Sequence, residues 1–152
     1  MAGKATASFS YPFPRPSITV DVALVTREAI PRILLIRRRG APFAGSWALP
    51  GGFVNADEPL RVAAARELKE ETGLDMSDLE QLHTFGDPGR DPRGWTVSVA
   101  YLARVWPGEF KPMAGDDAAE VAWYPLDTPP PLAFDHAEIL ARVRHRLADR
   151  AE

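Results

Sequence analysis

The sequence predicts a single α/β domain in which strands and helices pack in layers around one core. Its 152 residues are the length of one ordinary domain. Hydrophobic residues make up 45% and charged residues 26%, which is typical of a folded globular chain rather than a disordered one. β-branched runs and two amphipathic segments follow one another along the chain in the order strands, helix, strands, helix.

The strands are predicted from runs of β-branched and aromatic residues bounded by proline and glycine. The first two are joined by a short turn through Pro31, so we expect an antiparallel hairpin. The predicted strands cover residues 18–26, 32–37, 47–49, 79–85, 95–106 and 121–124. Glycine and proline predict loops at residues 38–46, 86–94 and 107–118.

Two helices are predicted from end signals and apolar periodicity. The first lies between Pro59 and Thr72, because proline suits the first helical turn and Gly73 suits the stop. The second runs from His136 to Arg150, with apolar residues at helical spacing. We expect His136, at its start, to have a structural role.

Residues 1–17 are predicted to form an extended arm in front of a domain that covers residues 18–152. Prolines at positions 12, 14 and 16 exclude a helix there. Tyr11 and Phe13 in this arm are candidates for stacking on a substrate base. The alternative is that they pin the arm to the domain or to a second subunit, and exchange of arms would give a homodimer.

Charge and composition exclude several classes of function. The net charge of −3 gives no reason to expect a nucleic acid or an anionic membrane as partner. The absence of cysteine excludes disulfides, thiolate zinc sites and a cysteine nucleophile. Lys4 is not followed by an apolar run, and no stretch approaches the ~20 apolar residues of a membrane helix. We therefore expect a cytoplasmic protein.

Three glutamates on the first predicted helix are the sharpest functional signal. At ~100° per residue, Glu67, Glu70 and Glu71 lie within ~100° of one another on one face. Their mutual repulsion is best explained by a bound cation, and hard oxygen ligands favour Mg²⁺ or Mn²⁺ over zinc. Arg66 cannot bind a metal, so it is expected to pair with Glu58 or with the cluster. The alternative is a solvated acidic face.

The complete spacing around these glutamates carries a family resemblance. From Gly52 to Leu74 the chain reads G-x5-E-x7-R-E-L-x-E-E-x-G-L, which resembles the signature box of the Nudix hydrolases without a departure. The resemblance implies an α/β/α sandwich with a mixed central sheet. It also implies divalent-metal hydrolysis of a nucleoside diphosphate derivative. On the matching positions it implies metal ligands at Glu67, Glu70, Glu71 and the Gly51 carbonyl, and structural roles for Gly52, Glu58, Arg66 and Gly73.

A second stretch suggests the substrate. The R-D-P-R-G sequence from Arg90 to Gly94 resembles the ADP-ribose pyrophosphatase branch of this family, and so does Pro88. The resemblance implies cleavage of ADP-ribose to AMP and ribose 5-phosphate. Arg90 and Arg93 are then candidates for bidentate phosphate recognition, as is Arg37 at the end of a strand. Solvated surface charges are the alternative for all three arginines.

The general base and the exact function stay open at this point. Glu70 is one candidate for the base, and the loop residues Asp116, Asp117 and Glu120 are the others. The substrate could instead be an oxidised nucleotide, a dinucleoside polyphosphate or an NAD-type dinucleotide. A third alternative is a non-catalytic sensor of ADP-ribose or NAD metabolites. The intact glutamate pattern favours the enzyme, and so does the chain's end two residues after Arg150, where no DNA-binding domain follows.

Overall fold

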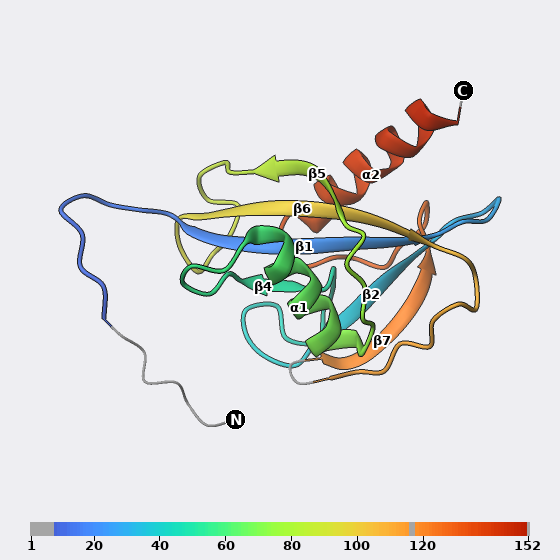
Figure 1. Ribbon diagram of the computed structural model, residues 1–152, viewed down its shortest axis with the longest axis horizontal. Coiled ribbons are helices and arrows are strands. Elements are labelled where there is room, and N and C mark those ends of the chain that lie inside the picture. Colours follow the sequence, from blue (N-terminus) through green and yellow to red (C-terminus); the bar gives the residue numbers. More distant parts are fainter. Residues whose placement is uncertain (1–7, 116–117, 152) are drawn as a thin grey trace.

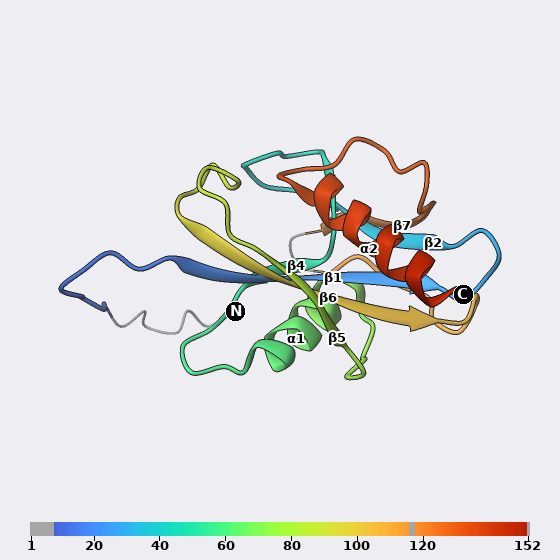
Figure 2. The same ribbon diagram turned by 90° about the horizontal axis from the view of Figure 1, so that it is seen from above.

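A mixed β-sheet lies between two helices in the computed structural model, which describes residues 8–115 and 118–151 (Figures 1 and 2). The base candidates Asp116 and Asp117 lie outside the described residues. The strands are β1 (Ser17–Thr26), β2 (Arg32–Arg38), β3 (Trp47–Ala48), β4 (Gly51–Phe53), β5 (Glu80–Phe85), β6 (Thr96–Val105) and β7 (Ala118–Pro125).

The sheet is mixed because β1 has neighbours of both directions. It runs parallel to β6 along its whole length, and antiparallel to β2 and β4. The main strand order is β3-β2-β1-β6-β5, with β4 paired to β1 and β7 paired to β2. The predicted hairpin of the first two strands is present. This is the layered α/β/α sandwich with a mixed sheet that the resemblance implies.

The glycine-rich strand β4 is the element that the sequence did not predict as a strand. Gly51 and Gly52 have low strand propensity, yet they pair with Asp21 and Val20 of β1. Tertiary pairing therefore overrides local preference here. β7 also begins at Ala118, three residues earlier than expected, because it pairs with β2 as far as Arg38.

Helix α1 (Leu60–Thr72) covers one face of the sheet. Pro59 precedes it, and Gly73 ends it with a left-handed φ of 76°, a conformation that glycine adopts without strain. Its buried side chains include Ala64 and Leu68, which belong to the same core cluster as Val22 of β1. This packing fixes which face of α1 looks toward β4.

Helix α2 (His136–Arg150) covers the opposite face, as Figure 2 shows. Ile139 and Val143 of α2 pack in a second core cluster with Ala23 and Val25 of β1. Because successive side chains of a strand point to opposite faces, β1 contributes to both cores. The first turn of α2 is thereby placed beside β1 and the segment before β4.

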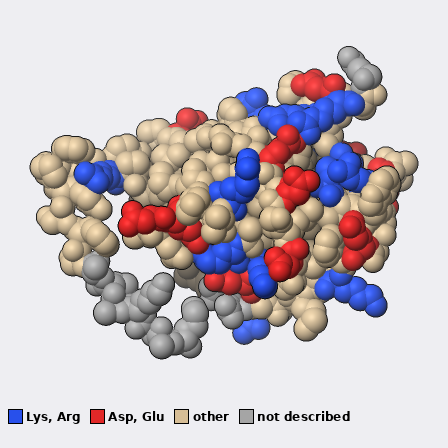
Figure 3. Space-filling model, in the orientation of Figure 1, with Lys and Arg blue, Asp and Glu red and all other residues tan. Residues whose placement is uncertain are grey.

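The described surface carries mixed charge. On the face shown in Figure 3, acidic and basic side chains are interspersed rather than gathered in a field of one sign. Neither helix of the described residues combines the length and the apolar character that crossing a membrane requires.

Candidate active site

Two of the three predicted metal-binding glutamates line one cleft. Glu67 and Glu71 face it, whereas Glu70 lies on the outer surface of α1 with 42% of its side chain exposed. We call this space the glutamate cleft, and its volume is 420 Å³. Its lining residues are Ile36, Arg38, Gly40, Ala41, Gly51, Gly52, Phe53, Glu67, Glu71 and Arg93.

The backbone of β4 lies directly against these two carboxylates. The Gly51 amide donates a hydrogen bond to Glu71 Oε2 at 3.4 Å. A Cβ atom at Gly52 would come within 2.6 Å of the Glu67 carboxyl group, so only glycine leaves room for that side chain. The predicted Gly51 ligand is thus placed next to Glu71, because β4 pairs with β1.

Arg66 ties the loop before α1 to the glutamates. Its guanidinium donates to both carboxylate oxygens of Glu58, at 2.7 and 2.9 Å. It also donates to Glu67 at 2.8 Å, to Glu70 at 3.2 Å and to the Phe53 carbonyl at 3.1 Å. The hydrogen bond to Glu58, more than those to the other glutamates, raises the pKa of Arg66. Arg66 therefore pairs both with Glu58 and with the glutamate cluster, which the sequence had left as alternatives.

The donor set fits a divalent cation. Burial raises the pKa of Glu67 even though Arg66 opposes the shift, so this carboxylate gains from further positive charge. Carboxylates together with a backbone carbonyl are ligands that Mg²⁺ and Mn²⁺ accept. Within residues 8–115 and 118–151, no three carboxylate or histidine side chains converge on one point.

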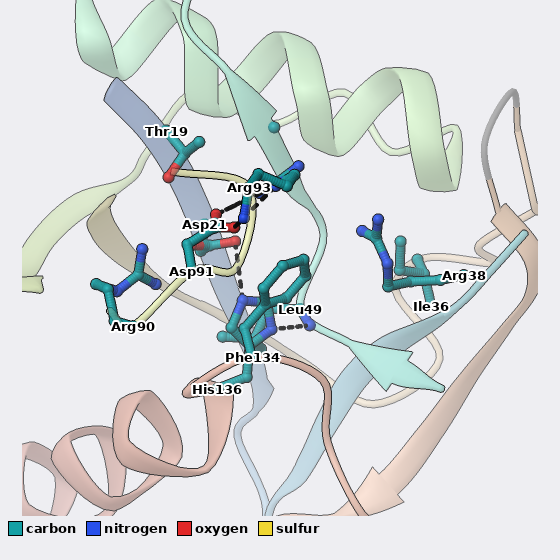
Figure 4. A pocket seen from close by; sticks show the side chains of 12 residues that line it. Thr19, Asp21, Ile36, Arg38, Leu49, Arg90, Asp91, Arg93, Phe134 and His136 are labelled. Carbon is teal, nitrogen blue, oxygen red and sulfur yellow. Dashed lines mark hydrogen bonds and ion pairs between the residues drawn. The ribbon is translucent and has the colours of Figure 1, made fainter. Parts of the chain in front are cut away.

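Two arginines and one aromatic ring line the same cleft, and a second ring lies beside it. Arg93 lines the glutamate cleft and lies between two rings, with its guanidinium carbon 4.6 Å from the centroid of Phe53 and 4.8 Å from that of Phe134. It also pairs with Asp91 at 2.7 Å. Arg38 lines the same cleft, and its guanidinium carbon lies 4.9 Å from the centroid of the Phe134 ring. Both side chains also line the neighbouring pocket that Figure 4 draws. Such pairing and stacking fix guanidinium planes in space.

Arg90 does not lie at the glutamate cleft. Its side chain is only 6% exposed, and it donates twice to Asp135, at 2.8 and 2.6 Å. Pro88 is exposed and does not line the cleft. These two residues of the substrate-suggesting loop thus stand apart from the glutamates, whereas Arg93 stands among the cleft residues.

Arg37 and Glu120 pair with each other outside the cleft. Arg37 Nη1 lies 3.0 Å from Glu120 Oε1, and both side chains are about half exposed, at 45% and 55%.

In the arm, Tyr11 and Phe13 are also exposed, and Arg15 stacks over the Tyr11 ring at 3.6 Å. The arm and Phe53 line a separate open groove next to the glutamate cleft.

Sequence reasoning missed Arg38, Phe134 and Asp21. Strand alternation could have selected Arg38 over Arg37, since Arg38 shares its face of β2 with Leu34, which packs in the core below α1. Asp21 is a carboxylate within a run of apolar strand residues, and that contrast was the available signal. No comparable sequence pattern pointed to Phe134, because its position depends on the path of the chain before α2.

An α/β/α sandwich that brings glutamates and arginines together around one cleft fits the class of enzymes that act on phosphate compounds. Comparison with known proteins specifies the family. The family model described as NUDIX domain matches residues 15–143. An ADP-ribose pyrophosphatase of Methanocaldococcus jannaschii is 44% identical over 125 residues, covering 82% of this chain and 71% of that protein.

The chain therefore belongs to the Nudix family, and it is a Nudix pyrophosphohydrolase related to ADP-ribose pyrophosphatase. Nudix hydrolases generally use divalent metal ions. The NUDIX domain of Shewanella oneidensis NrtR, solved in complex with ADP ribose, has a TM-score of 0.82 and 36% identity. That match covers 91% of this chain and 94% of the solved chain.

A regulator is also among the relatives. The ADPR responsive transcriptional repressor NtrR of Acinetobacter baylyi is 38% identical over 145 residues, which cover 91% of this chain. This chain spans only 57% of the repressor's length.

Proposed function

We propose that this protein hydrolyses ADP-ribose to AMP and ribose 5-phosphate with Mg²⁺, or Mn²⁺ in its place. The observation that carries the proposal is the glutamate cleft, where Glu67 and Glu71 line one space together with Arg38 and Arg93. A diphosphate bridging two sugars needs charge neutralisation on its oxygens and a water aimed at phosphorus. The related pyrophosphatase and the ADP-ribose-bound neighbour support this choice of substrate.

Each side of the cleft has its own task in this proposal. Glu67, Glu71 and the Gly51 carbonyl would hold the metal, with Glu70 joining from the exposed edge of α1. The bound metal would supply charge neutralisation and a lowered water pKa. Arg93 has a fixed guanidinium plane and is suited to a phosphate oxygen pair.

The remaining predicted contacts belong to the same proposal. Arg37, Arg90 and Pro88 would take part only in contacts outside the glutamate cleft. Tyr11 and Phe13 would stack on the adenine from the groove that they share with Phe53. Exchange of the arm between two subunits would make a homodimer, and we expect the protein in the cytoplasm.

Candidates for the general base remain Glu70, Glu120, Asp116 and Asp117. Glu70 is paired with Arg66 and Glu120 with Arg37, so each would have to leave its partner to accept a proton. Replacing each residue in turn by its amide, and recording kcat at saturating Mg²⁺, distinguishes them. The base is the residue whose loss lowers kcat without raising the Mg²⁺ requirement.

A sensor of ADP-ribose is the second candidate, because a repressor described as ADPR responsive is 38% identical to this chain. A sensor would bind ADP-ribose and release it unchanged. The unbroken glutamate pattern from Gly52 to Leu74 favours hydrolysis over sensing.

The test is AMP release from ADP-ribose with Mg²⁺, measured beside NADH, a diadenosine polyphosphate and 8-oxo-dGTP. We expect metal-dependent cleavage of ADP-ribose with the highest kcat/KM of the four. A higher kcat/KM for another compound would overturn the substrate and keep the family chemistry. Tight binding of ADP-ribose without cleavage of any compound would establish the sensor.

A further inference from the structure

His136 is a buried histidine with a defined set of partners outside the glutamate cleft. It is 4% exposed and stands at the start of α2. The Leu49 amide donates a hydrogen bond to its Nδ1 at 3.0 Å, and its Nε2 lies 3.4 Å from Asp21 Oδ1 (Figure 4). Both ring nitrogens are thus engaged by groups from elements that flank β4.

The partners determine the tautomer of the ring. A backbone amide can only donate, so Nδ1 must accept and carries no proton. In a neutral imidazole the proton then lies on Nε2, where it faces the Asp21 carboxylate. The other oxygen of that carboxylate accepts a short hydrogen bond from the hydroxyl of Ser98, which is fully buried on β6. Leu49 thus donates to His136 and His136 to Asp21, while Ser98 donates to Asp21 from the other side, so the hydrogen bonds converge on the Asp21 carboxylate.

This chain of groups ends on the segment that carries the predicted metal ligand. The Pro50 carbonyl accepts from the Val22 amide at 2.8 Å, and Gly51 pairs with Asp21 in the sheet. A Cβ atom at Gly51 would come within 2.4 Å of Asp21 Oδ1, so the backbone rests on the same carboxylate that His136 contacts. On its other side Gly51 donates to Glu71. A shift of Leu49 would therefore also shift Gly51, because only Pro50 separates the two residues.

We propose that His136, as its neutral Nε2–H tautomer, is a positioning residue that holds residues 49–52 against Glu67 and Glu71 and so sets the metal affinity of the cleft. This role rests on the metal site of the proposed function but not on the identity of its substrate. His136 itself touches neither glutamate in the described contacts. Outer groups that orient metal ligands commonly change metal affinity by about 10- to 100-fold when lost.

The experiment compares His136→Leu, which removes both polar contacts, with His136→Gln, which keeps one donor and one acceptor. Val143→Ala is the matched control, because Val143 is fully buried on the same helix, about two turns beyond His136, and its apolar side chain forms no hydrogen bond. Mn²⁺ dissociation constants are measured by titration calorimetry, without nucleotide. We expect the Mn²⁺ dissociation constant to be about 10-fold larger for the leucine variant and closer to the wild-type value for the glutamine variant. For the control it should change by less than about 2-fold.

A second readout works on the metal-free protein and does not depend on any activity. Amide hydrogen exchange at Leu49 and Gly51 is expected to be about 10-fold faster in His136→Leu than in Val143→Ala, compared at equal free energy of unfolding. Long-range ¹H–¹⁵N spectra of the wild-type imidazole should show the proton on Nε2. Failure of the wild type to bind Mn²⁺ would sink the proposed function, while the exchange data would still decide the role of His136. Unchanged exchange and Mn²⁺ affinity in the leucine variant, or a proton on Nδ1, would overturn the positioning role.

Discussion

Arg90 is a charged side chain that the fold keeps almost entirely out of water. Asp135 compensates for this burial by supplying opposite charge through two hydrogen bonds, and the Thr96 carbonyl accepts a third at 3.4 Å. The pair joins the loop before β6 to the residue that precedes α2. Arg90 therefore has a structural task that does not require substrate.

Removing one partner of this pair should be costly. We expect Asp135→Asn to lower the free energy of unfolding by about 3 kcal/mol, because a buried guanidinium loses its counter-charge. Urea denaturation at neutral pH measures the change. Glu28→Gln is the control, since Glu28 pairs with Arg32 in an exposed position and its loss should leave the free energy of unfolding nearly unchanged. Equal effects in the two variants would show that Asp135 does not hold Arg90.

His136 should make stability depend on pH below neutrality. Burial lowers its pKa, although Asp21 and Asp135 oppose the shift and Arg90 and Arg38 reinforce it. The unfolded chain binds this proton from about pH 6.5 downward, and the folded chain only at lower pH. The stabilisation is thus complete above about pH 6.5 and is lost as the pH falls, by at most about 1.4 kcal/mol per unit.

The measurement for this effect is the free energy of unfolding between pH 7 and pH 5, in wild type and in His136→Gln. We expect the wild-type value to fall more steeply, because glutamine takes up no proton. Parallel curves would mean that His136 binds its proton equally well in both states.

At the scale of elements, the loop before β7 closes the end of α1. The Met113 amide donates to the Thr72 carbonyl at 2.7 Å, and the Gly115 amide donates to the Glu71 carbonyl at 3.0 Å. These bonds satisfy carbonyl groups that a helix end leaves without partners.

Gly115 has no room for a side chain at this junction. A Cβ atom there would come within 2.0 Å of the Glu70 carbonyl oxygen. We expect Gly115→Ala to cost about 1–3 kcal/mol in the free energy of unfolding, because the loop must move away from α1. Gly40→Ala, where a Cβ meets nothing within 4 Å, should change it by less than about 0.5 kcal/mol in the same thermal or urea melts. A similar small change in both variants would contradict the close docking of the loop.

Across the whole molecule, the features that could be predicted from the sequence are those set by residues close together in the chain. Alternating and helical periodicities with clear end signals placed every predicted strand and both helices close to their observed bounds. The exception, β4, has glycines where strand preference is weak, and only pairing with β1 makes it a strand. The spaced box pattern pointed to the glutamate face of α1 because its residues are close in sequence.

The arginine and aromatic side chains in and beside the cleft could not be assembled in this way. Arg38, Phe53, Arg93 and Phe134 come from four separate segments, and no spacing in the sequence relates them. Their meeting depends on the sheet order and on the path of the loops. Arg90 and Arg93 look equivalent in sequence, but they differ in the structure because one meets Asp135 and the other meets the cleft.

The most direct test of the account is the initial rate of AMP formation from ADP-ribose as a function of Mg²⁺ concentration, in wild type, Glu71→Gln and Lys69→Gln. Lys69 is the matched control, because it lies on the same helix with its side chain 61% exposed and paired only with Asp75 in the described contacts. We expect saturable Mg²⁺ dependence in wild type and Lys69→Gln, and a rate at least about 100-fold lower in Glu71→Gln, with unchanged folding. A Glu71→Gln enzyme with the wild-type rate and Mg²⁺ dependence would contradict the assignment of the glutamate cleft as the active site.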